Sequence, residues 1–192
     1  MKPAPCPWVK THCEKEYHDR EWGRPEHDDR KLFEMLILEG MQAGLSWLTI
    51  LKKREAMRKA FDGFDPVKIS LYDEGKVDEL LENADILRSR AKISALKVNA
   101  QAFLAVVKEF GTFDRYLWSF VNYEPLVNQR EKMEDIPAET DQSRALSRDL
   151  KKRGFKFVGP VICYAYMQAV GMVNDHLVNC PQYNPEPAAD QG

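Results

Sequence analysis

Apolar residues recur at intervals of three to four along most of this chain, which is the spacing of amphipathic helices. The spacing predicts helices at about residues 14–21, 32–38, 46–61, 73–83, 89–110, 113–121, 143–153 and 160–171. The alternation of apolar and polar residues that is typical of strands is almost absent, and no internal repeat is visible. The segment 122–140 is polar and contains two prolines, so we expect a long surface loop there. The pattern therefore predicts an all-α protein.

The helical pattern is interrupted at residues 38–47, where two glycines, a carboxylate and a tryptophan follow one another closely. Glycine inside a helix costs roughly 1 kcal/mol relative to alanine. Gly40 and Gly44 therefore indicate a sharp turn or the close approach of another backbone. One interpretation is a simple loop between two helices, with Trp47 as part of the core. The other is that this stretch forms a functional site.

The length and composition indicate a globular protein. A chain of 192 residues can bury one full core, so we expect a single domain over residues 1–192, built from two helical lobes. No apolar run approaches the roughly 18 residues of a membrane span, and the N-terminus lacks the apolar core of a signal peptide. We therefore expect no membrane contact and a cytoplasmic location. The tail at about 182–192 is rich in Pro, Ala, Asp and Gln and is expected to be flexible.

The charge distribution limits how nucleic acid could be bound. The formal net charge is −2, so any surface for nucleic acid must be a local basic patch. The expected outer face of helix 46–61 carries the cations Lys52, Lys53, Arg54, Arg58 and Lys59.

A second basic stretch, residues 150–161, combines a basic helix end, a turn bounded by glycines and the start of a new helix. Backbone N–H groups at a helix start bind anions, and Lys151, Lys152 and Lys156 would add attraction to phosphate. The stretch is thus a candidate clamp for a DNA backbone. The alternative is a basic helix C-terminus that only complements the helix dipole.

Four cysteines, at positions 6, 13, 163 and 180, are widely separated in a chain without an export signal, so disulfides are not expected. Cys6 lies twelve residues before His18, and His176 lies four residues before Cys180. Two cysteines and two histidines form a tetrahedral ligand set that zinc accepts. If the fold brings both pairs together, a structural zinc would join the N-terminal arm to the C-terminal end. Ordinary buried histidines and cysteines are the alternative, because the spacing is not that of a compact zinc finger.

Aromatic residues gather in the first quarter of the chain, which holds Trp8, Tyr17, Trp22 and Trp47 together with Glu39. Aromatic faces can stack on an extruded base. A buried carboxylate can accept a hydrogen bond from the exocyclic amine of a base or stabilise a cation beside it. The alternative is that the aromatics are core residues and Glu39 a solvated helix residue.

Five groups of residues closely resemble the DNA-3-methyladenine glycosylase I family, and the match runs from about Cys6 to Cys180. They are Tyr17-His18-Asp19 with Glu21-Trp22-Gly23, Leu38-Glu39-Gly40 with Gln42-Ala43-Gly44-Leu45-Ser46-Trp47, Trp118-Ser119-Phe120-Val121-Asn122, Lys151-Lys152-Arg153-Gly154-Phe155-Lys156-Phe157-Val158-Gly159, and Asn174-Asp175-His176. The resemblance implies the helix-hairpin-helix DNA glycosylase fold, with a lobe in which zinc joins the two ends of the chain. It also implies a repair enzyme that acts on double-stranded alkylated DNA. Sequence leaves the oligomeric state open, but an enzyme that scans a duplex works well as a monomer, so a monomer is expected.

The resemblance further implies roles for individual residues. Glu39 and Tyr17 would contact 3-methyladenine, Trp47 would stack on the base, and Trp8 and Trp22 would help to wall the pocket. The hairpin would be residues 155–159, with its amides holding a phosphate. Its turn shares only Val158 and Gly159 with the superfamily's usual Leu-Pro-Gly-Val-Gly. The implied zinc ligands are Cys6, His18, His176 and Cys180.

The chemistry of the implied substrate fits these residues. Methylation at N3 makes adenine cationic, so the base leaves as a neutral molecule and strong general-acid help is unnecessary. The enzyme mainly extracts the base and lets water attack an oxocarbenium-like sugar. Lyase-competent relatives place a lysine where this chain has Val161, so a monofunctional glycosylase is expected. For the catalytic carboxylate, Glu39 stands ahead of Asp175. A non-catalytic, zinc-stabilised module that binds DNA or damaged bases is the alternative function.

Overall fold

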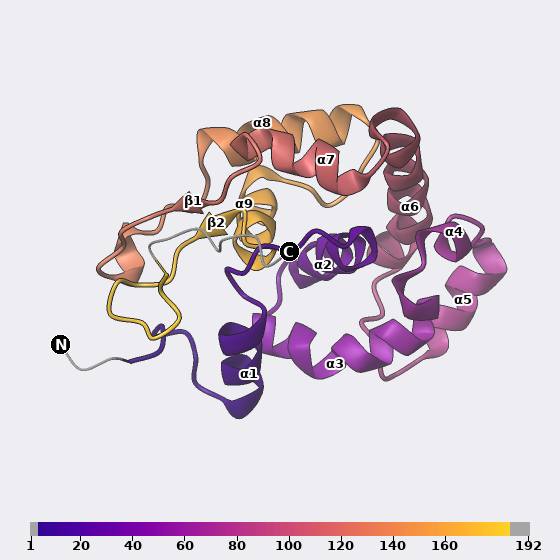
Figure 1. Ribbon diagram of the computed structural model, residues 1–192. Coiled ribbons are helices and arrows are strands. Elements are labelled where there is room, and N and C mark those ends of the chain that lie inside the picture. The colour runs from indigo at the N-terminus through magenta and orange to yellow at the C-terminus, as the bar shows by residue number, and fades with distance from the viewer. Residues whose placement is uncertain (1–3, 185–192) are drawn as a thin grey trace.

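A long buried helix, α2, forms the centre of the molecule in the computed structural model, which describes residues 4–184 (Figure 1). All ten residues from 32 to 41 are buried, because α2 packs against α3, α6, α7 and α9 on its different sides. Asp28 is its N-cap, and the Asp28 side chain accepts a hydrogen bond from the Lys31 amide at 2.9 Å. α2 therefore provides a rigid support through the middle of the fold.

The predicted helices are confirmed to within a few residues at most ends. The described α-helices are α1 (His12–Arg20), α2 (Asp29–Gln42), α3 (Trp47–Ala60), α4 (Pro66–Ile69), α5 (Glu74–Glu82), α6 (Arg90–Phe110), α7 (Phe113–Trp118), α8 (Asp141–Lys152) and α9 (Pro160–Ala169). Three short 3₁₀ helices are η1 (Asp62–Phe64), η2 (Ser119–Val121) and η3 (Met133–Asp135). Figure 1 shows α7 and α8 along one side of α2, α3 along the other, and α4 to α6 at one end.

The interruption predicted at residues 38–47 is narrower in the structure. α2 continues through Gly40 to Gln42, and only 43–46 leave the helix before Ser46 caps α3. A methyl group at Gly40 would lie 3.3 Å from the Cβ of Phe157, so this glycine permits a close contact inside a continuous helix. Gly44 has a φ of +82° and makes the turn. Of the two explanations offered by the sequence, close approach thus applies to Gly40 and a sharp turn to Gly44.

The segment 122–140 is the surface connection that was expected, but it also contains a strand. β1 (Leu126–Val127) pairs in parallel with β2 (Val173–Asn174), with Leu126 opposite Val173. The predicted all-α class is confirmed as a mostly helical fold, to which this short strand pairing is the addition. Alternating polarity cannot be detected in two-residue strands, and their pairing joins segments far apart in sequence.

The remaining expectations concern the ends and the surface. None of the described helices is long and apolar enough to cross a membrane. Of the tail expected to be flexible, residues 185–192 lie outside the described part of the chain. All four cysteines are free in this structure. The single domain with two lobes stays a prediction.

Candidate functional site

Three helices bring together three buried polar atoms that have no protein partner. They are the hydroxyl of Tyr17 on α1, Oε2 of Glu39 on α2 and Nε1 of Trp47 at the start of α3. No other side-chain nitrogen or oxygen among the described residues is both buried and unpaired. Buried polar groups are nearly always hydrogen-bonded, so each unpaired one calls for an explanation. A polar ligand bound between the three helices would provide the missing partners.

The aromatic rings around these atoms are close to one another. The ring centroids of Tyr17 and Trp47 are 5.3 Å apart, and those of Tyr17 and Trp8 are 6.3 Å apart. Tyr17 is buried, whereas Trp47 and Trp8 are only half-buried. The site therefore has an aromatic lining with a partly accessible side, which suits a flat apolar ligand with polar edges.

Burial dominates the electrostatics of the site. Desolvation raises the pKa of Glu39 from its ordinary value of 4.5 to about 8. Desolvation, followed by the nearby charges of Glu39 and Glu21, raises the pKa of Tyr17 well above its ordinary range. At neutral pH the Glu39 carboxyl is therefore mostly protonated in the free protein. A cation beside it would favour the ionised form.

Trp22 lies against a different group of side chains. Its ring is 4.6 Å from that of His176 and 6.0 Å from that of His18, and 5.3 Å from that of Trp8. No ring contact joins it to Tyr17 or Trp47 among the described residues. Trp8 contacts both groups, while a role for Trp22 in walling the site stays a prediction.

The two Cys/His pairs predicted from the sequence do meet. One potential ligand atom from each of Cys6, His18, His176 and Cys180 lies within 4.8 Å of all the others, and all four residues are buried. Cys180 Sγ is 3.5 Å from His18 Nε2 and 3.6 Å from His176 Nδ1, and Cys6 Sγ is 3.7 Å from His176 Nδ1. Sulfur and nitrogen ligands of a tetrahedral zinc are about 3.5 Å apart, so this cluster could hold a metal ion.

The outer nitrogens of the two histidines are held by the surrounding protein. His18 Nδ1 lies 2.8 Å from the carboxylate of Asp19, and His176 Nε2 lies 3.0 Å from the carbonyl of Trp22. Both arrangements fix the inward nitrogen as the lone-pair donor, as in metal-binding histidines. Burial lowers the pKa of His176 to about 4, so its ring is neutral at physiological pH. A neutral imidazole is the form that binds a metal.

Asn99, a buried residue of α6 that the sequence interpretation missed, forms hydrogen bonds to the turn at residues 155–159. Its side chain accepts a hydrogen bond from the Lys156 amide at 2.7 Å and donates one to the Lys156 carbonyl at 3.2 Å. Ser147 donates to the carbonyl of Val158 at 2.6 Å. The amides of residues 157–159 have no hydrogen-bond partner in the described part of the chain. The turn therefore presents N–H groups at the start of α9, a suitable arrangement for an anion.

The charges near this turn divide into free and paired ones. Lys151, Lys152 and Lys156 are exposed and form no ion pair with any described residue. Arg153 is engaged with Asp149 at 2.6 Å and Glu109 at 2.7 Å. The three lysines remain available for an external anion.

Asp175 is fully engaged by neighbouring side chains and is completely buried. Its Oδ2 accepts hydrogen bonds from Tyr164 at 2.5 Å and Gln168 at 2.8 Å. Its Oδ1 accepts from Asn128 at 2.8 Å and Arg130 at 3.2 Å. Four donors hold this carboxylate in place, which argues for a structural role.

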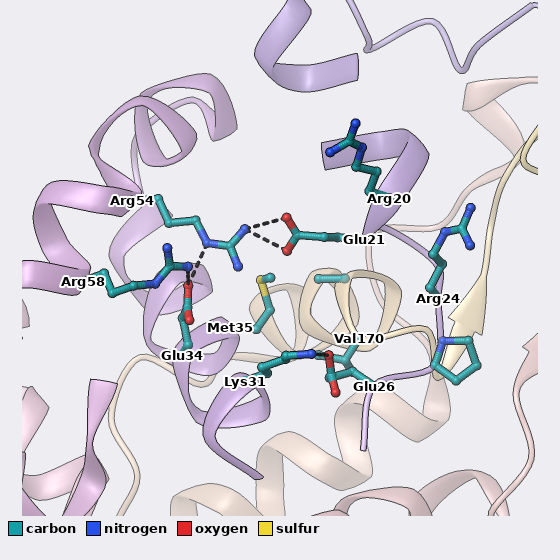
Figure 2. Close-up of a pocket in the computed structure, with 12 residues that line it drawn as sticks. Arg20, Glu21, Arg24, Glu26, Lys31, Glu34, Met35, Arg54, Arg58 and Val170 are labelled. Carbon is teal, nitrogen blue, oxygen red and sulfur yellow. Dashed lines mark hydrogen bonds and ion pairs between the residues drawn. The ribbon is translucent and has the colours of Figure 1, made fainter. Parts of the chain in front are cut away.

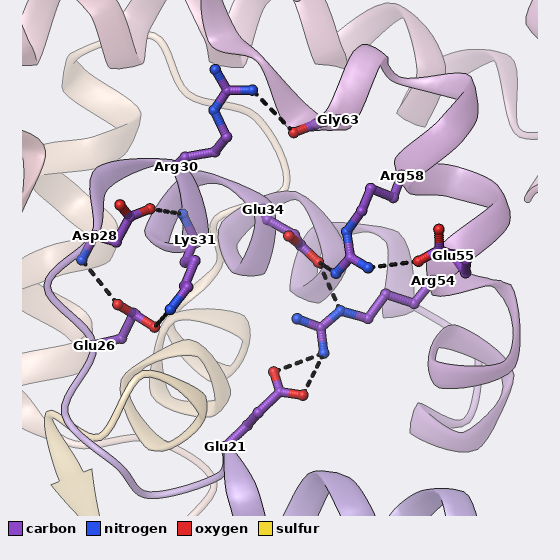
Figure 3. A network of polar contacts seen from close by, with 10 residues as sticks. All are labelled: Glu21, Glu26, Asp28, Arg30, Lys31, Glu34, Arg54, Glu55, Arg58 and Gly63. Atoms are coloured by element: carbon purple, nitrogen blue, oxygen red, sulfur yellow. Dashed lines mark hydrogen bonds and ion pairs between the residues drawn. The ribbon is translucent and has the colours of Figure 1, made fainter.

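One predicted surface cation is directed inward instead. Arg54 was expected on the outer face of α3, but its side chain is only 18% exposed and pairs with Glu34 of α2 and with Glu21 (Figure 3). The prediction of an outward Arg54 is wrong, because helical periodicity cannot reveal a buried partner on another helix. These residues also line a surface pocket of about 620 Å³ (Figure 2). None of the three unpaired groups lines that pocket.

Comparison with known proteins gives a consistent picture. A family model described as methyladenine glycosylase matches residues 8–183. The DNA-3-methyladenine glycosylase of Haemophilus influenzae is 50% identical over 177 residues, covering 92% of this chain and 96% of that protein. DNA-3-methyladenine glycosylase 1 of Escherichia coli is 52% identical over 179 residues, covering 93% and 96%.

Similarity extends to the three-dimensional structure. A crystal structure of a tyrosine-to-phenylalanine variant of 3-methyladenine DNA glycosylase I, in complex with 3-methyladenine, superposes with a TM-score of 0.90 at 39% identity. The match covers 92% of this chain and 95% of that chain.

Proposed function

The chain belongs to the methyladenine glycosylase family, and we propose that it excises 3-methyladenine from alkylated DNA at the site formed by Tyr17, Glu39 and Trp47. The observation that carries this assignment is the set of three buried, unpaired polar atoms on three different helices. A purine extruded from the helix has polar atoms at its edge and two apolar faces, so it complements both the unpaired atoms and the aromatic lining.

The three side chains have distinct roles in recognition. Glu39 accepts a hydrogen bond from the exocyclic amine of the base or faces its positive charge, and Tyr17 offers a hydroxyl to the base edge. The ring of Trp47 stacks on the base. A cation against an aromatic face and a buried carboxylate is worth about 2 kcal/mol or more once it is desolvated. Undamaged adenine carries no such charge, so this term favours the methylated base.

Bond cleavage needs little from the protein, because the methylated base departs as a neutral molecule. Glu39 is the remaining candidate for stabilising the oxocarbenium-like sugar or orienting water, since both oxygens of Asp175 are occupied by four donors. Val161, which is 53% exposed, stands where lyase-competent relatives have a lysine. The reaction is therefore a hydrolysis without a lyase step.

The hairpin binds the DNA backbone in this proposal. Free amides at residues 157–159 hold one phosphate, and Lys151, Lys152 and Lys156 add attraction that does not depend on sequence. In this proposal the protein is a helix-hairpin-helix glycosylase that acts as a monomer on double-stranded DNA.

The Cys/His cluster holds a structural zinc ion in this proposal. Cys6, His18, His176 and Cys180 fill all four positions, so no site is left for a catalytic water. The ion supplies stability by joining the N-terminal arm to the C-terminal end. It takes no part in bond cleavage.

The decisive experiment measures free bases released from methylated duplex DNA by chromatography. We expect release of 3-methyladenine by the wild-type protein and a strongly reduced rate for Glu39→Gln. The alternative function, a non-catalytic module for damaged bases, predicts binding to methylated DNA without release. Binding without any release of 3-methyladenine would therefore refute the enzymatic assignment.

A further inference from the structure

An ion-pair network joins the same three helices that carry the unpaired groups (Figure 3). Arg54 of α3 donates from Nε to Glu34 of α2 at 2.7 Å. Its Nη1 donates to both carboxylate oxygens of Glu21, at 2.9 and 2.8 Å, at the end of α1. Glu34 also accepts from Arg58 at 2.6 Å. One guanidinium therefore bridges three helices.

The network is buried enough to hold a definite geometry. The Glu34 side chain is 8% exposed and that of Arg54 is 18% exposed. Charged hydrogen bonds to a planar guanidinium restrict orientation as well as distance. Loss of one partner from a buried pair leaves an uncompensated charge, so the structure resists relative movement of the helices. The outer ends of the network, Glu21 and Arg58, are more open, at 43% and 39% exposed, and line the pocket of Figure 2.

Two members of the network lie close to base-site groups along their own helices. Glu21, the C-cap of α1, follows Tyr17 by one turn, and Arg54 follows Trp47 by two turns, so both pairs lie on common helix faces. Electrostatics agree with this proximity: after burial and Glu39, the charge of Glu21 raises the pKa of Tyr17 and that of Arg54 lowers it. On α2, Glu34 and Glu39 are five residues apart and face different sides, so Glu34 fixes the helix itself.

We propose that Arg54 is a positioning residue for base recognition, which sets the mutual placement of Tyr17, Glu39 and Trp47 by joining their helices. This inference rests on the proposed function of the base site. A shift of about 1 Å in a binding group can cost up to a hundredfold in rate, so a fixed helix spacing has a functional consequence. The competing explanation is that the network only stabilises the fold.

The test removes one connection and leaves the buried part intact. Glu21→Ala detaches α1 from Arg54, while the Arg54 pair with Glu34 remains. Glu55→Ala is the matched control, because Glu55 accepts from Arg58 at 2.6 Å on the same helix without reaching α1 or α2. The two carboxylates are comparably exposed, at 43% and 63%. Glu21→Gln keeps a hydrogen bond to Arg54 without the charge.

Three measurements are made on each protein: the Tm, the affinity for free 3-methyladenine, and ¹⁹F NMR of 5-fluorotryptophan-labelled protein without ligand. The Trp47 resonance is assigned with Trp47→Phe. For Glu21→Ala we expect a shifted or broadened Trp47 resonance, because the nearby Tyr17 ring moves, with the Trp118 resonance unchanged. We also expect about tenfold weaker binding of 3-methyladenine. Glu55→Ala should leave the Trp47 resonance unchanged and the affinity within about twofold of wild type. Glu21→Gln should give values between those of Glu21→Ala and the wild type.

Other outcomes would overturn the inference. A lower Tm with an unchanged affinity for 3-methyladenine would mean that the network only stabilises the fold. Equal losses in Glu21→Ala and Glu55→Ala would point to a general charge effect. Failure of the wild-type protein to bind 3-methyladenine would refute the proposed function instead. In that case the Trp47 resonance, which needs no ligand, would decide alone whether Glu21 and Arg54 position the site.

Discussion

Replacing Glu39 by glutamine should stabilise the free protein, and should do so more at pH 8 than at pH 5. Burial raises the pKa of the Glu39 carboxyl from 4.5 to about 8, because the ionised form loses its hydration and its Oε2 has no protein partner. Glutamine has nearly the same shape and no titratable proton. The substitution therefore removes this electrostatic penalty while it retains the packing.

The direction of this pH dependence follows from proton binding in the folded and unfolded states. The folded protein binds the Glu39 proton more tightly than the unfolded chain does, so the contribution of this group to stability falls as pH rises from about 4.5 to about 8. At about 1.36 kcal/mol per pH unit, the loss is about 1 kcal/mol at pH 5 and about 4 kcal/mol at pH 8. The free energies of unfolding of the variant and the wild type should therefore diverge by about 3 kcal/mol between these pH values.

Urea denaturation of both proteins at pH 5 and pH 8 measures this difference. His18, His176 and the other titrating groups are common to both proteins, so their effects cancel. Glu55→Gln, an exposed substitution, should follow the wild type at both pH values. A stability difference that changes by less than about 0.5 kcal/mol with pH would show that Glu39 is not desolvated in the free protein. Together with the weaker base recognition expected of Glu39→Gln, the predicted result would identify a site that gives up stability for function.

Three further predictions concern the hairpin and the Cys/His cluster. Asn99→Ala removes both hydrogen bonds to the Lys156 peptide, so affinity for duplex DNA in fluorescence anisotropy should fall about tenfold, while affinity for free 3-methyladenine stays unchanged. An equal loss of affinity for duplex DNA and for 3-methyladenine would contradict a role of Asn99 confined to the hairpin. Lys151→Ala should reduce the slope of log affinity for DNA against log salt by about 1, and an unchanged slope would exclude a phosphate contact. Chelation should lower the Tm of the wild-type protein but not that of His176→Ala, and fresh protein with less than about half an equivalent of zinc would contradict a structural site.

Local sequence patterns were sufficient for most of the helices. The apolar periodicity of 89–110, for example, needs only neighbours within two or three turns, and α6 runs over Arg90–Phe110 as predicted. The N-caps Asp28 and Ser46 are equally local, because each side chain bonds to an amide three residues away. The two-residue strands escaped notice because they contain no period and depend on a distant partner.

The candidate site was only partly accessible to the same reasoning. Residue types and motifs singled out Tyr17, Glu39 and Trp47, but their common lack of a hydrogen-bond partner is a property of three packed helices. Asn99 was missed and Arg54 was predicted to face outward, because nothing adjacent in sequence distinguishes them from ordinary polar residues. Their importance comes from the Lys156 backbone and from Glu34 on α2.

The sequence by itself determined most of the helices, the residue types of the site, and the two cysteines and two histidines of the cluster. Tertiary structure decided that Gly40 lies inside a continuous helix against Phe157, that Arg54 turns inward, and that the Cys/His pairs meet. Helix formation and capping depend on contacts within a few residues, which a sequence displays directly. Burial, desolvation and interatomic distance depend on segments far apart in the chain. The raised pKa of Glu39 therefore exists only once α1, α2 and α3 are packed together.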